Sequence, residues 1–257
     1  MQKTPIVISL SSFGASEVKR HGQAKFVDIS KEAGADGVEI RSELLSPNKS
    51  ELSFIAQQAE WMHRVFSCAA PLFSGDGELQ TDNISYALEC SELLRADVIK
   101  FSIGGGSRAS YQQYKRLGTL LGNKASSVLI ENDQSNTSGS IFHLKRFFDK
   151  STEAGLKLGM TFDIGNWHWT GECPRTAVDE FVDRVKYVHM KGVYRQPAKW
   201  VAVPLAESQA PWKSILDSLP AKTPWAIEYP LIGDDLVEIT KREVEQLRAL
   251  NGERYVN

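Results

Sequence analysis

The sequence predicts an α/β fold, a single (β/α)8 TIM-barrel domain over residues 1–257. Four short apolar strands in the second half of the chain each end in a side chain that can bind a metal, namely Glu131, Asp163, His189 and Glu228. The intervals between them are 32, 26 and 39 residues. One strand, one helix and two loops take about this length in a barrel of ~250 residues. The chain of 257 residues has the length of one such barrel.

Four successive strands of a parallel barrel would aim these side chains at one point. The catalytic residues of such barrels lie where the strands leave the carboxyl-terminal face. One carboxylate at a strand end is usually only a solvated terminus. Three carboxylates around one imidazole are different, because they would repel one another unless a divalent cation neutralised them. The set therefore predicts a metal site.

The composition excludes several classes of partner. Lys and Arg number 30 against 32 Asp and Glu, and a net charge of −2 gives no basic field for phosphate backbones, so we expect no nucleic acid. The apolar run Pro5–Leu10 is too short for a signal peptide or a membrane span. Cys68, Cys90 and Cys173 are odd in number and widely spaced, which favours reduced thiols. We therefore expect a cytoplasmic protein without a membrane partner.

The first half of the chain predicts four strand–helix units. Nearly continuous apolar runs predict buried strands over Pro5–Leu10, Gly37–Arg41, Arg64–Ala70 and Asp97–Ile103. Helical spacing of apolar residues predicts a helix after each of the first three, and the first helix ends at Gly34, which suits a left-handed cap.

Several residues of this half have two interpretations. Phe13, just after the first strand, is a candidate wall of a substrate pocket. Glu39 is either an inward-facing acid near the metal or a partner of Arg41 or of a basic residue on a neighbouring strand. His63 is expected to cap the end of a helix. The run Gly104–Gly106 could expose backbone N–H groups to a phosphate or a sugar oxygen, although it lacks the P-loop pattern.

The second half supplies further candidates around the mouth of the barrel. Trp167 and His168 lie in the loop directly after Asp163 and could form an apolar wall and lid, although the tryptophan could equally be a packing residue. Lys191 shares its strand face with His189, so it points inward if the histidine does. Arg195 lies in the cationic loop that follows, and a solvated charged loop is the alternative interpretation.

The chain resembles a known family over nearly its whole length. The stretches ISLSSFGA, VLIENDQ, MTFDIGNWHW, VAVP and AIEYPLIGDDL are similar to the epimerases of ketogluconate-utilisation operons. These belong to the xylose isomerase-like superfamily of sugar-phosphate isomerases and epimerases, whose members place Glu, Asp, His and Glu at the ends of strands five to eight around a divalent metal. The resemblance implies that Glu131, Asp163, His189 and Glu228 are these ligands.

The resemblance is incomplete at the substrate contacts. In ketose 3-epimerases of the superfamily, a histidine three residues after the Asp and a glutamate six residues after the first Glu hold the substrate. Here these positions are Asn166 and Thr137, whereas an arginine six residues after the metal histidine is retained as Arg195. The sugars of those epimerases are therefore not assumed for this chain.

The expected activity is that of a metal-dependent sugar, sugar-acid or sugar-phosphate isomerase or epimerase. A divalent cation on a carbonyl and its adjacent hydroxyl makes the neighbouring carbon acid more acidic, because it stabilises the enediolate. Glu131 and Glu228 come from non-adjacent strands and are the expected acid and base. Hard oxygen ligands with one imidazole favour Mn²⁺, with Mg²⁺, Co²⁺ or Zn²⁺ as alternatives and no nucleotide cofactor.

Other functions stay open. On the same metal site, a dehydratase would expel a β-hydroxyl from the same carbanion. A non-catalytic sugar-acid binding protein is the alternative from another class, although it would have no use for two opposed carboxylates. An endonuclease-IV-like repair enzyme needs a basic DNA face and more histidines than the five present. The expected partner is a small sugar or sugar acid, and a homo-oligomer is left open.

Overall fold

Eight parallel strands form a closed barrel in the computed structural model, which describes residues 4–46 and 49–253. Around the barrel the order is β1-β10-β7-β6-β5-β4-β3-β2, so neighbours in sequence are neighbours in space once the inserted β8 and β9 are set aside. The barrel strands are β1 (Ile6–Ser9), β2 (Gly37–Arg41), β3 (His63–Ser67), β4 (Val98–Phe101), β5 (Val128–Glu131), β6 (Gly159–Asp163), β7 (Val185–Met190) and β10 (Trp225–Ile227). The predicted barrel is confirmed.

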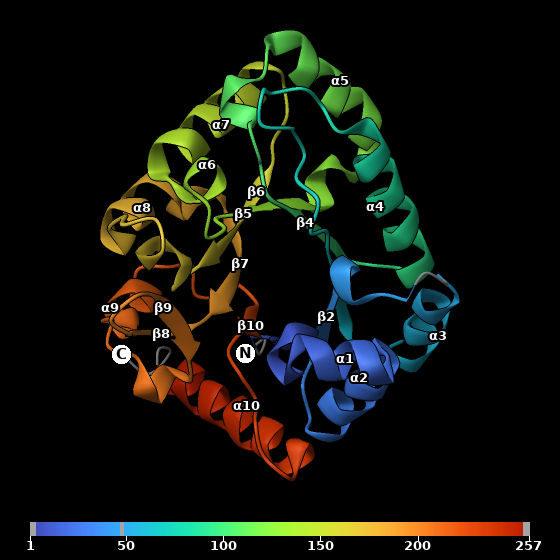
Figure 1. The fold of residues 1–257 in the computed structure, drawn as a ribbon, viewed down its shortest axis with the longest axis vertical. Helices are drawn as coiled ribbons and strands as arrows, with labels where there is room; N and C mark the ends of the chain where they lie inside the picture. The colour runs from blue at the N-terminus through green and yellow to red at the C-terminus, as the bar shows by residue number, and fades with distance from the viewer. Residues whose placement is uncertain (1–3, 47–48, 254–257) are drawn as a thin grey trace.

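Helices surround the strands as an outer ring, and the colour runs once around this ring from blue to red (Figure 1). Each connection between parallel strands has to cross back over the barrel, and helices make most of these crossings. The helices are α1 (Ala15–His21), α2 (Gln23–Glu32), α3 (Ser50–Gln58), α4 (Thr81–Leu94), α5 (Tyr111–Leu121), α6 (Asn136–Gly139), α7 (Ile141–Glu153), α8 (Pro174–Phe181), α9 (Trp212–Asp217) and α10 (Leu236–Glu253). Among the described residues, no helix is both long and apolar enough to cross a membrane.

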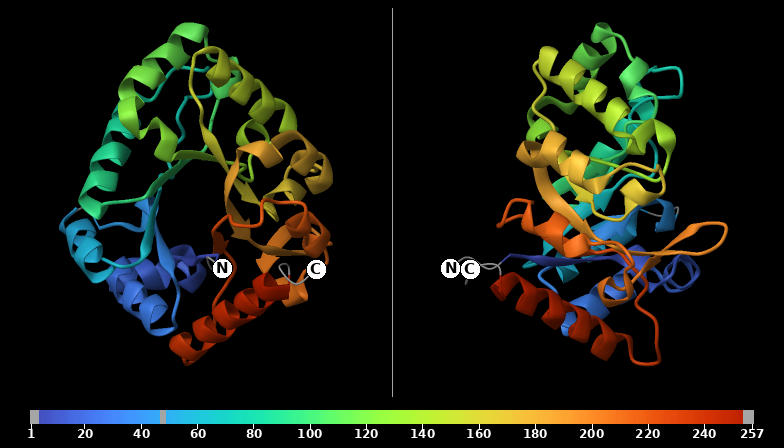
Figure 2. Two further views of the ribbon diagram at one scale, coloured as in Figure 1. Left: turned by 180° about the vertical axis from the view of Figure 1, so that it is seen from behind. Right: turned by 90° about the vertical axis from the view of Figure 1, so that its left-hand side faces the viewer.

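A β-hairpin interrupts the unit between β7 and β10. Strand β8 (Gly192–Arg195) pairs antiparallel with β9 (Trp200–Val203), and the right-hand view of Figure 2 shows the hairpin, in orange, projecting from one end of the barrel. The sequence predicts only a cationic loop here. Strand β9 was not predicted, although Trp200–Val203 is a continuous apolar run, because the run has only four residues and lies inside a cationic loop.

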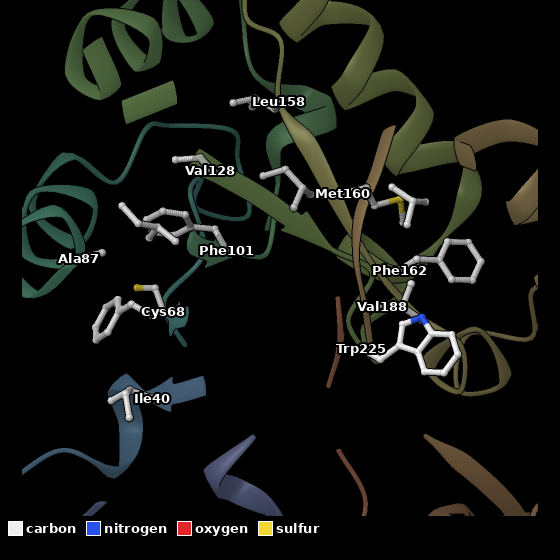
Figure 3. Close-up of a cluster of buried hydrophobic side chains, with 14 of the residues drawn as sticks. Ile40, Cys68, Ala87, Phe101, Val128, Leu158, Met160, Phe162, Val188 and Trp225 are labelled. Carbon is white, nitrogen blue, oxygen red and sulfur yellow. The ribbon is translucent and has the colours of Figure 1, made fainter. Parts of the chain in front are cut away.

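The core consists of two apolar regions separated by the strands. The larger one lies between the strands and the helices, and Figure 3 shows part of it, including Ile40, Phe101 and Trp225. The smaller one fills the amino-terminal end of the barrel and contains Val7, Val65, Leu129, Tyr187 and Ala226. Because side chains alternate along a strand, the inward position two residues further on is polar or charged in most strands. The barrel interior is thus apolar at one end and charged at the other.

Two local predictions have different outcomes. The helix end at Gly34 is confirmed, because α2 ends just before it and its φ of +79° is left-handed. The expected helix cap at His63 is wrong: α3 ends at Gln58, and His63 is the first residue of β3, with its Nδ1 3.2 Å from Asp97 Oδ2. The apolar spacing continues past the helix because Ala59 and Met62 pack in the core from a turn.

The three glycines after β4 do not expose their backbone to a ligand. Gly104 N–H donates to Ser138 Oγ, Gly105 N–H to Phe73 O, and Gly106 N–H to Ile103 O. A Cβ on Gly104 would lie 2.0 Å from Phe73 O, and one on Gly105 would lie 2.2 Å from the Ser74 carbonyl oxygen. The phosphate-loop interpretation is therefore wrong, and close packing of two loops explains the glycines.

Gly104→Ala should destabilise the protein by about 2–4 kcal/mol, because the new methyl group meets the Phe73 carbonyl and the residue has a φ of +55°. Urea unfolding measures the change. Gly75→Ala, in the facing loop, is the control, since a Cβ there meets nothing within 4 Å. Equal stabilities of the two variants would contradict the packing argument.

Candidate metal centre

Four side chains from four neighbouring strands converge at the carboxyl end of the barrel. Glu131 and Asp163 are the last residues of β5 and β6, His189 is the register partner of Asp163 on β7, and Glu228 directly follows β10. One potential ligand atom from each of them lies within 4.8 Å of the others. The structure therefore brings together the four residues that the sequence analysis placed at one point.

The ligand atoms are arranged around the His189 ring. Its Nδ1 lies 2.7 Å from Glu228 Oε2, 3.1 Å from Glu131 Oε1 and 3.7 Å from Asp163 Oδ2. Its Nε2 lies 2.8 Å from Glu39 Oε2 on the other side of the fully buried ring. A metal bound among the three carboxylates would take the place of a proton on Nδ1, while Glu39 would keep the proton on Nε2.

The backbone fixes which oxygen of Asp163 is available. Its Oδ1 accepts hydrogen bonds of 2.8 Å from both Gly165 N–H and Asn166 N–H. Its Oδ2 is fully buried and makes no hydrogen bond of normal geometry, although Lys191 Nζ lies 2.7 Å away. An under-used buried carboxylate oxygen, grouped with two more carboxylates and one imidazole, fits a divalent cation. The residues present therefore fit the divalent metal that the sequence resemblance implies.

Three permanent cations lie in the same network of charges. Lys100 Nζ, which is 1% exposed, lies 2.8 Å from Glu39 Oε1 and 3.0 Å from Glu131 Oε2. Arg41 donates to the second oxygen of Glu228, at 2.9 Å. The network as a whole contains the carboxylates of Glu39, Glu43, Glu131, Asp163 and Glu228 and the cations of Arg41, Lys100 and Lys191. Five carboxylates face three cations here, so the network has an excess of negative charge that favours a bound cation.

The buried cations keep the glutamates ionised. Burial raises the pKa of Glu131, but the Lys100 ammonium and the His189 ring outweigh it and leave the pKa below its ordinary value. At Glu228, burial is likewise outweighed, here by the His189 ring and the Lys191 ammonium, so the pKa is well below its usual range. The carboxylates in turn raise the pKa of His189 despite its burial.

A pocket of about 410 Å³ opens beside the cluster, which is large enough for a small polar ligand. Lys191 and Glu228 connect it to the cluster, Phe13 forms part of its wall, and Ala202 lines it from the hairpin. The ring of Phe13 also stacks on Phe26, with a centroid distance of 5.0 Å, and its contact with a substrate stays a prediction.

Both interpretations of Glu39 are realised, because it accepts from His189 and also pairs with Arg41 at 3.2 Å. The expected place of Trp167 in a substrate wall is wrong. Its ring is fully buried against Phe162 and Phe181, and Phe162 lies on the helix-facing side of β6, opposite to Asp163. The chain turns after Asp163 and returns this ring to the core.

The structure places the remaining predicted residues at the mouth of the barrel. His168 is half-buried with its ring centroid 5.1 Å from that of Trp200 in the hairpin, and burial lowers its pKa. Arg195 is exposed on β8, and its guanidinium lies 5.3 Å from the centroid of the same tryptophan ring. Lys191 reaches the cluster itself.

The sequence analysis assigned no role in the site to Lys100, Asn132 or Asn166. The amide of Asn132 accepts from Asp163 N–H and donates to Asp163 C=O, and Asn166 donates to Asn132 C=O. The sequence could have indicated Lys100, because it lies between two apolar residues of a buried strand. Ile99 and Phe101 face the helices, so the lysine between them has to face the barrel interior. Asn132 gave no signal, because strand-to-loop junctions commonly contain asparagine, and Asn166 was noted only as a departure from the histidine of the ketose 3-epimerases.

No protein-family model matches this sequence, and no curated protein matches it significantly. Solved structures do resemble it. A xylose isomerase domain-containing protein of Salmonella typhimurium LT2 shares 14% identity over 98% of both chains, with a TM-score of 0.74. The IolI protein, solved with a bound zinc atom, shares 10% identity over 96% of this chain and 99% of its own, with a TM-score of 0.72. A 3-keto-D-glucoside 4-epimerase of E. coli shares 13% identity over 96% of this chain and 100% of its own, with a TM-score of 0.64.

These likenesses establish the fold: the chain is a xylose isomerase-like TIM barrel. Other solved structures of this fold differ in chemistry. They include a D-tagatose 3-epimerase-like protein, a protein named as a 3-DHS dehydratase from Bacillus anthracis and a family 2 AP endonuclease from Brucella melitensis. The fold alone therefore does not select a reaction, and the resemblance to ketogluconate-operon epimerases stays a prediction.

Protein that has been stripped of metal with a chelator should bind Mn²⁺ at one site per chain. His189→Ala and Asp163→Asn should each weaken this binding by about tenfold or more, because each removes or weakens one of four ligands. Isothermal titration calorimetry measures the affinities. His21→Ala is the control, since His21 lies on α1 and pairs there with Glu17. Undiminished binding in both ligand variants would refute the assignment.

Proposed function

We propose that this protein is a divalent-metal-dependent sugar isomerase or epimerase. The observation that carries the proposal is the convergence of three carboxylates and one imidazole beside a pocket of about 410 Å³. Sugar epimerases among the solved structures with this fold support it. When bound, the metal would polarise the carbonyl and adjacent hydroxyl of the substrate. We expect Mn²⁺, and the zinc of the IolI structure makes Zn²⁺ the first alternative.

Glu131 and Glu228 are proposed as the acid and base of the proton transfer. They flank Asp163 and His189 from strands β5 and β10, which do not pair with each other, so they approach the centre from two sides. Each turns one oxygen toward His189 Nδ1, and a cation holds the other oxygen: Lys100 for Glu131 and Arg41 for Glu228. Ionised carboxylates in fixed positions can accept a proton from a carbon acid.

The substrate-contacting groups are proposed from the pocket. Phe13 would pack against the carbon skeleton of the sugar, and Lys191 would contact an oxygen or the anionic end of a sugar acid or sugar phosphate. Arg195 and His168 would close the site from the hairpin side, where both rest on Trp200.

A dehydratase is the second candidate, because a protein named as a 3-DHS dehydratase has the same fold. It would use the same base and expel a β-hydroxyl as water. Incubation of ketoses, sugar acids and their phosphates with Mn²⁺ in D₂O, followed by NMR, distinguishes the candidates. Epimerisation or isomerisation replaces carbon-bound hydrogen by deuterium and gives an isomer of the substrate. Dehydration gives a new unsaturated product that has lost one water. A substrate that binds and stays unchanged would indicate a binding protein.

Glu131→Gln and Glu228→Gln should each lower kcat by about 10²–10⁴-fold or more while metal binding falls much less, because glutamine keeps an oxygen ligand but cannot act as a base. Steady-state kinetics and calorimetry on the same preparations measure the two effects. Glu43→Gln is the control, since Glu43 pairs with Arg41 at the rim and is not a ligand. Substantial turnover by metal-loaded Glu228→Gln would eliminate the two-carboxylate mechanism.

Arg195→Ala should raise KM for an anionic substrate more than for its neutral counterpart, with a smaller effect on kcat, because the exposed guanidinium lies on the hairpin and not in the cluster. Kinetics with a sugar acid and the corresponding neutral sugar measure this. An equal rise for both substrates would contradict an anion-binding role and would indicate that Arg195 only supports the Trp200 ring.

A further inference from the structure

Lys191 occupies the oxygens that a metal at this site needs. Its Nζ lies 2.7 Å from Asp163 Oδ2 and 2.8 Å from Glu228 Oε2. These two oxygens are also the ones that approach His189 Nδ1, at 3.7 Å and 2.7 Å. The ammonium group of Lys191 and the ring of His189 therefore approach the same two carboxylate oxygens.

The two acids have no other oxygen to offer. Asp163 Oδ1 accepts from two backbone N–H groups, and Glu228 Oε1 accepts from Arg41. A metal ion that avoided Lys191 would have to break these hydrogen bonds. A metal ion on the shared oxygens would lie within a few ångströms of a positive charge, which is strongly repulsive inside a protein. Lys191 and a divalent cation are thus competitors for the same place.

Lys191 also contacts one partner that is not a metal-ligand candidate. Asn166 Oδ1 lies 2.9 Å from Nζ, and this oxygen also accepts from Gln134 Nε2 at 3.2 Å. Both Gln134 and Lys191 line the pocket beside the cluster. An ammonium that leaves the two carboxylates can keep its amide partner and remain in the pocket wall.

The other buried lysine differs in this respect. Lys100 contacts Glu131 Oε2 and Glu39 Oε1, whereas Glu131 Oε1 is the oxygen that approaches His189 Nδ1. Lys100 therefore neutralises the cluster without covering an oxygen needed for the metal. The two lysines have equal charge and similar burial, so they form a matched pair for an experiment.

We propose that Lys191 is a built-in competitor of the metal: it neutralises Asp163 and Glu228 in the metal-free protein, and metal binding displaces its ammonium into the pocket, where the substrate meets it. The displacement makes the substrate-binding form of the pocket depend on the metal. The substrate part of this inference depends on the proposed function, whereas the competition itself depends only on metal binding.

The test compares Mn²⁺ affinity in wild type, Lys191→Met and Lys100→Met, measured by competition with a chelator of known affinity. Lys191→Met should bind Mn²⁺ about tenfold tighter or more, and Lys100→Met should gain clearly less. Unchanged or weaker binding by Lys191→Met overturns the inference. So does an equal gain in both variants, because net charge alone would then explain it.

Thermal unfolding without metal supplies a second readout. Lys191→Met should have a lower Tm than wild type in the presence of chelator, and Mn²⁺ should raise its Tm by more than it raises that of wild type. Lys145→Met, which removes a surface lysine paired with Glu180, controls for the substitution itself. If Lys191→Met fails to fold, Lys191→Gln removes the charge and keeps an amide donor for Asn166. A metal-induced rise no greater than that of wild type overturns the inference.

The outcomes separate this inference from the proposed function. Wild-type protein that binds Mn²⁺, with no tighter binding in the Lys191 variants, removes the competition and leaves the metal-dependent function standing. Wild-type and variant proteins that all fail to bind Mn²⁺ would overturn both.

Discussion

The carboxyl end of this barrel depends on the mutual neutralisation of charges that are removed from water. Glu39, Asp163 and His189 are fully buried, and Lys100 is almost so. An isolated charge in such a place would be very costly, and removing one partner of a buried pair typically costs about 3–5 kcal/mol. Each buried charge is therefore stabilised by its oppositely charged neighbours, and these ion pairs determine where the potential ligand atoms lie.

The alternation of side chains along the strands makes this balance possible. At the amino-terminal end, the inward residues are apolar and fill the barrel with Val7, Val65 and Leu129. At the next inward-facing position toward the carboxyl end, β2, β4 and β5 supply Glu39, Lys100 and Glu131. Two acids and a base therefore meet directly beside the apolar layer inside the barrel. The apolar layer excludes water from the amino-terminal side of the charged residues, which strengthens the electrostatic interactions among them. The same regularity delivers both the stability of the barrel and the convergence of the site.

Much of this could be read from the sequence because it depends on spacing. The strand ends at Glu131, Asp163 and His189 repeat at the interval of a barrel unit, and a barrel has only one place where its strand ends converge. Features that depend on which partner a side chain finds in space were not accessible. Trp167 looked like part of a pocket because it lies in the loop that directly follows Asp163, yet one turn of chain directs it into the core. The partners of Lys100 are distant in the sequence, so a lone lysine in a strand gave no indication of them.

The side-chain amide of Asn132 has a mechanical consequence for the site. It spans both the N–H and the C=O of Asp163, at 2.9 and 3.0 Å, and so continues the pairing of β5 with β6 beyond the last strand residue. Because Asn132 directly follows Glu131, two of the four ligands are attached to one rigid frame. These two hydrogen bonds fix the separation of the two carboxylates more firmly than strand pairing alone would. Glu228 is positioned differently: it follows a strand of only three residues, its N–H donates to Met190 O on β7, and Arg41 on β2 holds its side chain.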